Sequence, residues 1–68
     1  MNAKITLTYE ELIEMEQLLE REMDSTHTEM HRTKNKDFKD HIRHHLETIE
    51  HMLKVTREAR LPETVHSA

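Results

Sequence analysis

The sequence has no cysteine, no glycine and no tryptophan, and only one proline in 68 residues. Without cysteine, the chain forms neither disulfides nor thiolate metal sites. Turn-rich β architectures depend on glycine and proline, so the scarcity of both residues favours an all-α fold. The only aromatic residues are Tyr9 and Phe38. We therefore expect a core built mainly from Leu, Ile and Met side chains.

Long apolar runs are also missing. No stretch reaches the ~18 apolar residues of a membrane-spanning helix, and the N-terminal segment MNAKITLTYEEL lacks the apolar core of a signal peptide. We therefore expect a cytoplasmic protein that does not bind membranes. The absence of glycine also removes phosphate-binding loops and oxyanion turns, and no activated nucleophile is recognisable. The sequence does not predict an enzyme.

Charged residues are plentiful, at 35% of the chain, and the net charge is −4 when the seven histidines are neutral. Protonation of all seven histidines would make the chain positive, and ordinary imidazoles titrate near pH ~6.5. A basic cluster lies in the middle of the chain, without the interleaved aromatics typical of nucleic-acid binding. It consists of Arg32, Lys34, Lys36 and Lys39. Nucleic acid is therefore not an expected partner.

The first predicted helix runs from about residue 9 to about residue 31. Thr8 and Glu11 match a capping box, and Leu7 and Leu12 are spaced as a hydrophobic staple. Residues at helical spacing then form one core-facing stripe. They are Leu12, Met15, Leu19, Met23, Thr26 and Met30. We expect residues 1–7 to form an N-terminal arm.

The second predicted helix runs from about residue 37 to about residue 60, with Asp37 as its N-cap. Asn35 is expected in the preceding break, as a left-handed C-cap, and Pro62 ends the second helix. The core stripe of this helix consists of Phe38, Ile42, Leu46, Ile49, Leu53 and Thr56. An antiparallel helical hairpin over residues 8–61, followed by a frayed tail at 62–68, is preferred to one continuous helix.

A single hairpin would leave part of these wide apolar stripes uncovered. Two copies could bury them by dimerising into a four-helix bundle, and such an addition to the core suits a chain this short. The expected interface residues are Leu18, His41, His45, Met52 and Val55. The sequence leaves the relative orientation of the two hairpins open. If His41 and His45 lie at the interface, acidification should change association.

Histidine pairs suggest a metal site as an alternative. His27 with His31, and His41 with His45, are spaced i,i+4, which allows one helix face to chelate a divalent ion such as Zn²⁺. In a hairpin, the four rings could form one four-nitrogen site. Glu16 and Glu20 form an i,i+4 carboxylate pair on the same side as His27 and His31, but the Glu-x-x-His motif of di-iron bundles is missing.

The sequence thus predicts a small, non-enzymatic interaction or regulatory module that acts as a homodimeric helical bundle. A further protein partner, of unknown identity, is also expected. The alternative is a metal-binding four-helix bundle with histidine and carboxylate ligands. In the preferred interpretation the protein needs no cofactor.

Overall fold

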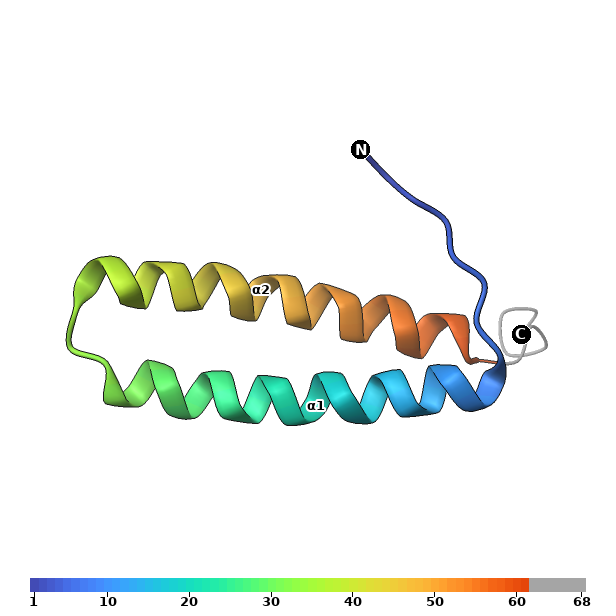
Figure 1. The fold of residues 1–68 in the computed structure, drawn as a ribbon, viewed down its shortest axis with the longest axis horizontal. Helices are drawn as coiled ribbons and strands as arrows, with labels where there is room; N and C mark the ends of the chain where they lie inside the picture. Colours follow the sequence, from blue (N-terminus) through green and yellow to red (C-terminus); the bar gives the residue numbers. More distant parts are fainter. Residues whose placement is uncertain (62–68) are drawn as a thin grey trace.

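The computed structural model describes residues 1–61, which form two antiparallel α-helices joined by a short connection (Figure 1). Helix α1 spans Tyr9–Arg32 and helix α2 spans Lys36–Ala59. The predicted helical hairpin is confirmed, and the alternative of one continuous helix is wrong. The observed helix bounds lie within one residue of the predicted ones. The predicted frayed tail, residues 62–68, lies outside the described residues.

The start of α1 is fixed by a local pair of hydrogen bonds. The backbone N–H of Glu11 donates to Thr8 Oγ1 at 3.1 Å, and the backbone N–H of Thr8 donates to Glu11 Oε1 at 2.7 Å. This is the predicted capping box, which satisfies two backbone donors that a helix start otherwise leaves free. The preceding residues, 1–7, form an arm without regular secondary structure.

The connection between the helices differs from the prediction in its capping residue. Asn35, not Asp37, is the N-cap of α2, and its Oδ1 accepts hydrogen bonds from the backbone N–H groups of Asp37 and Phe38. Asn35 has φ −81° and therefore is not a left-handed C-cap, while Thr33 ends α1 in an extended conformation. Both Asn and Asp are strong N-cap residues. The helix begins one residue earlier than predicted because Asn35 takes that role first.

The buried apolar core of residues 1–61 comes entirely from α2. Its members are Ile42, Leu46, Ile49 and Leu53, with exposed fractions of 8% or less. Thr26 and Thr56 are also buried, as predicted, and their hydroxyls donate to the carbonyls of Glu22 and Met52 at 2.7 Å. These bonds satisfy the two hydroxyls without a partner from the other helix.

The apolar stripe of α1 is covered less completely than that of α2. Its large apolar members are only half-buried, and they are Leu12, Met15, Leu19, Met23 and Met30. Two residues are buried in α1, Glu16 and Thr26, and both are polar. The hairpin therefore seals the core side of α2 while leaving the apolar side of α1 partly open.

Phe38 does not join the core, and its assignment to the buried stripe was wrong. Its side chain is 43% exposed and its ring stacks on that of His41, with the ring centroids 6.5 Å apart. Phe38 lies in the first turn of α2, where only the end of α1 is available to cover it. The spacing of the stripe was correct, but the hairpin is too short at this end to bury a large ring.

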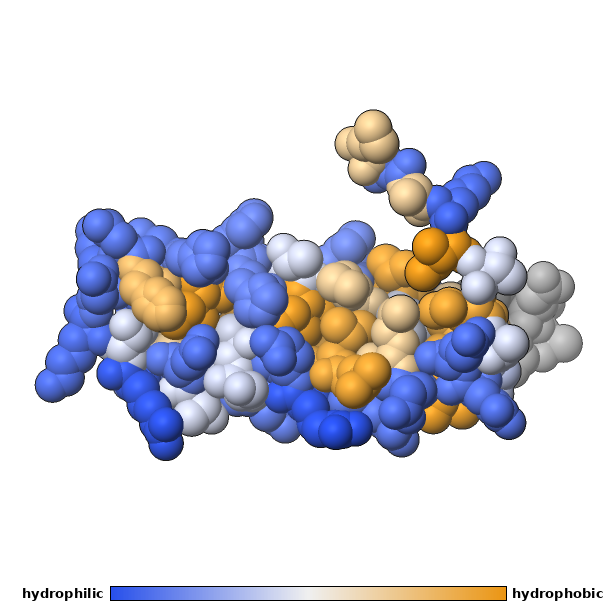
Figure 2. Space-filling model, viewed as in Figure 1, coloured by the Kyte–Doolittle hydropathy of each residue, from blue (hydrophilic) through white to orange (hydrophobic). Residues whose placement is uncertain are grey.

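Apolar surface follows the seam between the helices on the face shown in Figure 2, and much of it gathers near the chain ends. The large exposed apolar residues outside the arm are Tyr9, Leu18, Phe38, Met52, Val55 and Leu61. Within residues 1–61, neither helix has the length and apolar character needed to cross a bilayer.

Candidate interaction surface

The seam between the helices has two flanks of different chemistry. The ion-pair flank consists of Glu16 and Glu20 from α1 with Arg57 from α2 and Arg60, the residue that caps the end of α2. The open flank consists of Met15, Leu18, Glu22 and Glu29 from α1 with His41, His45, Met52 and Val55 from α2. At about 100° per residue, Arg57 and Val55 point about 200° apart on α2, so the two flanks lie on opposite sides.

The ion-pair flank is held by one buried carboxylate. Arg57 Nε lies 2.8 Å from Glu16 Oε2, and Arg60 Nε lies 2.9 Å from Glu16 Oε1. Arg60 also donates through Nη2 to Glu16 Oε2 at 3.3 Å, so its contact is bidentate. Glu16 is only 8% exposed. Both oxygens of this buried group are thus satisfied by cations from the other helix.

Hydrogen bonding sets the protonation of this carboxylate. The bonds from Arg60, and then those from Arg57, hold the pKa of Glu16 below its ordinary value, against the opposing effect of burial. Arg57 also reaches Glu20, with 3.6 Å between Arg57 Nη2 and Glu20 Oε1, but both of these side chains are half-exposed. Glu16 is therefore the centre of the flank and Glu20 lies at its edge.

Sequence reasoning missed this cluster. Glu16 and Glu20 were interpreted as an acidic pair beside a helical seam, and Arg57 and Arg60 were given no role. The paired residues are 41 and 44 positions apart in the chain. No local spacing connects them, because the contact depends on how the two helices are aligned along their length.

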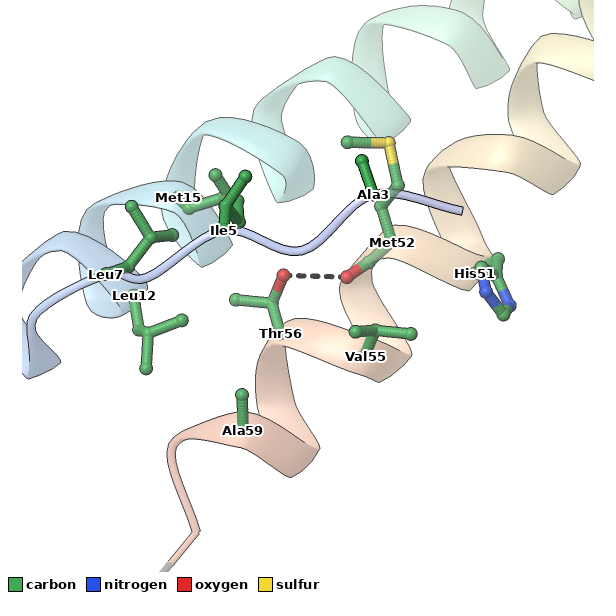
Figure 3. Close-up of a pocket in the computed structure, with 10 residues that line it drawn as sticks. All are labelled: Ala3, Ile5, Leu7, Leu12, Met15, His51, Met52, Val55, Thr56 and Ala59. Carbon is green, nitrogen blue, oxygen red and sulfur yellow. Dashed lines mark hydrogen bonds between the residues drawn. The ribbon is translucent and has the colours of Figure 1, made fainter. Parts of the chain in front are cut away.

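The open flank contains an apolar groove near the chain ends (Figure 3). The groove has a volume of about 380 Å³, and both helices and the N-terminal arm contribute to it. Its lining residues are Ala3, Ile5, Leu7, Leu12, Met15, His51, Met52, Val55, Thr56 and Ala59. Leu7 and Leu12, predicted as a staple, line this same groove. The arm passes over the groove, but Ile5 remains 73% exposed.

The open flank becomes polar toward the helix connection. A smaller hollow of about 260 Å³ is lined there by Glu22, Glu29, Phe38, His41, Ile42 and His45. His45 Nε2 lies 3.2 Å from Glu22 Oε1, which joins the two helices across the flank. Two histidines and two glutamates thus occupy the turn end, whereas methionine and aliphatic side chains occupy the other end.

The predicted interface residues all lie on the open flank. Leu18 is 52% exposed, Met52 is 42% exposed and Val55 is 49% exposed. His41 and His45 are also exposed and line the turn-end hollow. The structure therefore brings these five residues to one side of the hairpin.

The four histidines of the predicted metal site are not brought together. His27 projects within about 20° of Glu16 around α1 and is followed one turn later by His31, so both lie toward the ion-pair side. His41 and His45 line the open flank instead. Within residues 1–61, no group of three or more His, Cys, Asp or Glu side chains could hold a metal ion. The hairpin therefore contains no assembled four-nitrogen site.

Comparisons with known proteins do not assign a role to this surface. No protein-family model, curated protein or solved structure matches the chain significantly. Exposed apolar side chains that gather beside a groove are typical of surfaces that bind another protein.

Proposed function

We propose that this chain is a small, non-enzymatic interaction or regulatory module that acts as a homodimer. In the proposed dimer, two hairpins pack open flank against open flank as a four-helix bundle. The observation that supports the proposal most directly is the exposure of Leu18, Met52 and Val55 on one flank, at 52%, 42% and 49%.

The size of the core also supports a partner. Four buried apolar side chains in residues 1–61 are few for an independent fold, since small domains bury a limited fraction of their surface. The chain contains no cysteine, so a disulfide cannot supply the missing stability. Covering the open flank would bury the exposed side chains of Leu18, Met52 and Val55 and add a second layer to the core.

A second copy of the same chain is the simplest partner for the open flank. Two identical flanks related by a two-fold axis form a closed interface, which stops at the dimer. A helical hairpin presents two helices side by side. Two such pairs make a four-helix bundle, which is a common way for amphipathic helices to bury their apolar faces. The homodimer can then present its outer surface to a further protein partner.

The test replaces Leu18 with Glu and compares that variant with Gln17→Glu. Both substitutions add one negative charge at neighbouring exposed positions of α1, but only Leu18 belongs to the open flank. Burial of an unpaired charge is costly, so Leu18→Glu should weaken dimerisation at least about tenfold, while Gln17→Glu leaves it nearly unchanged. Sedimentation equilibrium measures both constants.

Circular dichroism on the same samples confirms that the variants remain helical. Wild-type protein that is a folded monomer throughout the micromolar range would overturn the proposal. Equal dissociation constants for the two variants would show that the dimer, if formed, uses a different surface.

A further inference from the structure

The open flank carries a second repeat on each helix, beside the stripe that forms the core. On α2, the repeat consists of His41, His45, Thr48, Met52, Val55 and Ala59, and on α1 it consists of Glu11, Met15, Leu18, Glu22, Ser25 and Glu29. Both series follow the spacing 4, 3, 4, 3, 4, which keeps a set of side chains on one helical face. A repeat of this kind is typical of a seam that packs against another helix.

The chemistry of these two repeats changes along the hairpin at the same height on both helices. Met15 and Met52 line the same groove near the chain ends. Glu22 and His45 are in contact nearer the turn, with 3.2 Å between Oε1 and Nε2. Each hairpin therefore presents one apolar half and one His–Glu half on its open flank.

Two-fold packing of the open flanks allows two orientations. In the same-end orientation, the axis runs parallel to the helices, and each α1 lies beside the second copy's α2 at the same height. In the opposite-end orientation, each α1 lies beside the second copy's α1, and the chain ends of one hairpin meet the turn of the other. The two orientations therefore bring different halves of the flank together.

We infer that the two hairpins dimerise with both turns at the same end, so that Glu22 and Glu29 of each copy face His45 and His41 of the other. This inference rests on the proposed homodimer. Same-end packing places the apolar half against the apolar half, with Met15 near the second copy's Met52. Opposite-end packing would instead place Met15 and Leu18 against the His–Glu half, which would cost the desolvation of those polar groups.

The charges of the helices favour the same orientation. Between Glu10 and Asp24, α1 carries seven acidic residues and one basic residue, whereas α2 carries five basic residues and four histidines in positions 37–60, with five acidic residues. Same-end packing puts the acidic helix beside the mixed helix of the second copy. Opposite-end packing puts the two acidic helices side by side, where like charges repel.

The proposed same-end arrangement should make dimerisation depend on pH. The charged groups that face His41 and His45 across the hairpin are Glu22 and Glu29, and the second copy adds the same two carboxylates. Because these two histidines lie at the proposed interface, we expect the dissociation constant of the dimer, measured by sedimentation equilibrium, to change between pH 8 and pH 6. His41→Gln with His45→Gln should weaken this pH dependence, whereas His44→Gln on the outer face should retain it.

Spin labels can measure the orientation directly, because the chain has no cysteine of its own. One variant carries a label at Lys34→Cys in the connection, and another carries it at Glu47→Cys near the middle of α2. Double electron–electron resonance then gives the distance between the two copies of each label. Same-end packing predicts a turn-to-turn distance below about 25 Å, whereas opposite-end packing separates the turns by roughly the 36 Å length of a 24-residue helix.

The label at position 47 tests the dimer separately from its orientation, because any such dimer gives a distance below about 30 Å between the two copies of this label. A short distance from both labels supports same-end packing. A short distance at position 47 with a turn-to-turn distance of about 36 Å or more overturns the orientation and leaves the dimer intact. No dipolar coupling from either label, with sedimentation as a monomer, overturns the proposed function itself.

Discussion

The two flanks of the hairpin seam differ in how far the chain itself covers their side chains. On the ion-pair flank, Arg57 of α2 and the C-cap residue Arg60 reach across to α1 and satisfy both oxygens of Glu16. On the open flank, Leu18, Met52 and Val55 remain about half-exposed. One flank is thus completed by residues of the same chain, and the other has apolar side chains that the described part of the chain does not cover.

This difference separates folding from association. Contacts on the ion-pair flank join α1 to α2, so they stabilise the hairpin at any protein concentration. Contacts that cover the open flank would come from a second molecule, so their contribution should rise with concentration by mass action. Substitutions on the two flanks should therefore have different experimental signatures.

The largest expected effect comes from the core on which both flanks depend. Leu53 is 2% exposed, and Leu53→Ala should lower the free energy of unfolding by about 2–5 kcal/mol, because it removes buried methyl groups and leaves a cavity. Urea unfolding followed by circular dichroism measures the loss. The neighbouring exposed residue offers a control, since Lys54→Ala should change stability by no more than about 0.5 kcal/mol. Equal losses of stability in the two variants would show that Leu53 does not belong to the core.

The sharpest contrast between the flanks lies in how the melting temperature depends on concentration. For wild-type protein it should rise as the concentration rises, and for the double variant Met52→Gln with Val55→Gln that dependence should largely disappear. Arg57→Gln on the ion-pair flank should lower the melting temperature at every concentration and keep the dependence. Differential scanning calorimetry over a hundredfold concentration range tests both. A concentration-independent wild type would remove the distinction between the flanks.

The pH dependence of the ion-pair flank follows from Glu16. Its pKa in the folded state is lowered by Arg60 and Arg57, so its contribution to stability is fully present above the ordinary carboxyl pKa of about 4.3 and is lost as pH falls through the lowered value. Glu16→Gln should therefore be less stable than wild type at pH 7, with the difference shrinking toward pH 3. Denaturant titrations at several pH values measure it, with the exposed Glu14→Gln as the control. A difference that stays constant with pH would contradict the assignment.

The smallest effect is expected at the edge of the same flank. Glu20 lies 3.6 Å from Arg57, and both side chains are 50% exposed. Exposed pairs of this kind contribute about 0–1 kcal/mol, so Glu20→Gln should change stability by less than about 1 kcal/mol. Thermal melts at low and high salt should show that even this small difference declines as salt screens the charges. A loss of stability as large as that of Glu16→Gln would mean that the two carboxylates contribute equally to the stability of the hairpin.

Local sequence signals predicted the helices well and the ends less well. The capping box of Thr8 and Glu11 depends on residues three apart, and it was correct. At the second helix, two strong capping residues, Asn35 and Asp37, lie close together, and the wrong one was chosen. Phe38 has the correct spacing for the core stripe, but spacing does not tell how much of the other helix is present to cover it.

The candidate surface was predicted in part. Leu18, Met52 and Val55 were identified because they are apolar residues beside a core stripe, and they are exposed in the hairpin. The groove was not predicted, because it needs side chains of the N-terminal arm beside those of both helices. The sequence grouped His27 and His31 with His41 and His45, whereas the helix rotation that aligns the core places the two pairs on different sides of the seam.

The sequence by itself determined that two amphipathic helices form and which face of each turns inward, because helical spacing and capping are properties of neighbouring residues. Only the tertiary structure decided that Glu16 meets Arg57 and Arg60 and that Phe38 stays exposed. These features depend on the rotation and the lengthwise alignment of one helix against the other. Both are set by packing between residues far apart in the chain.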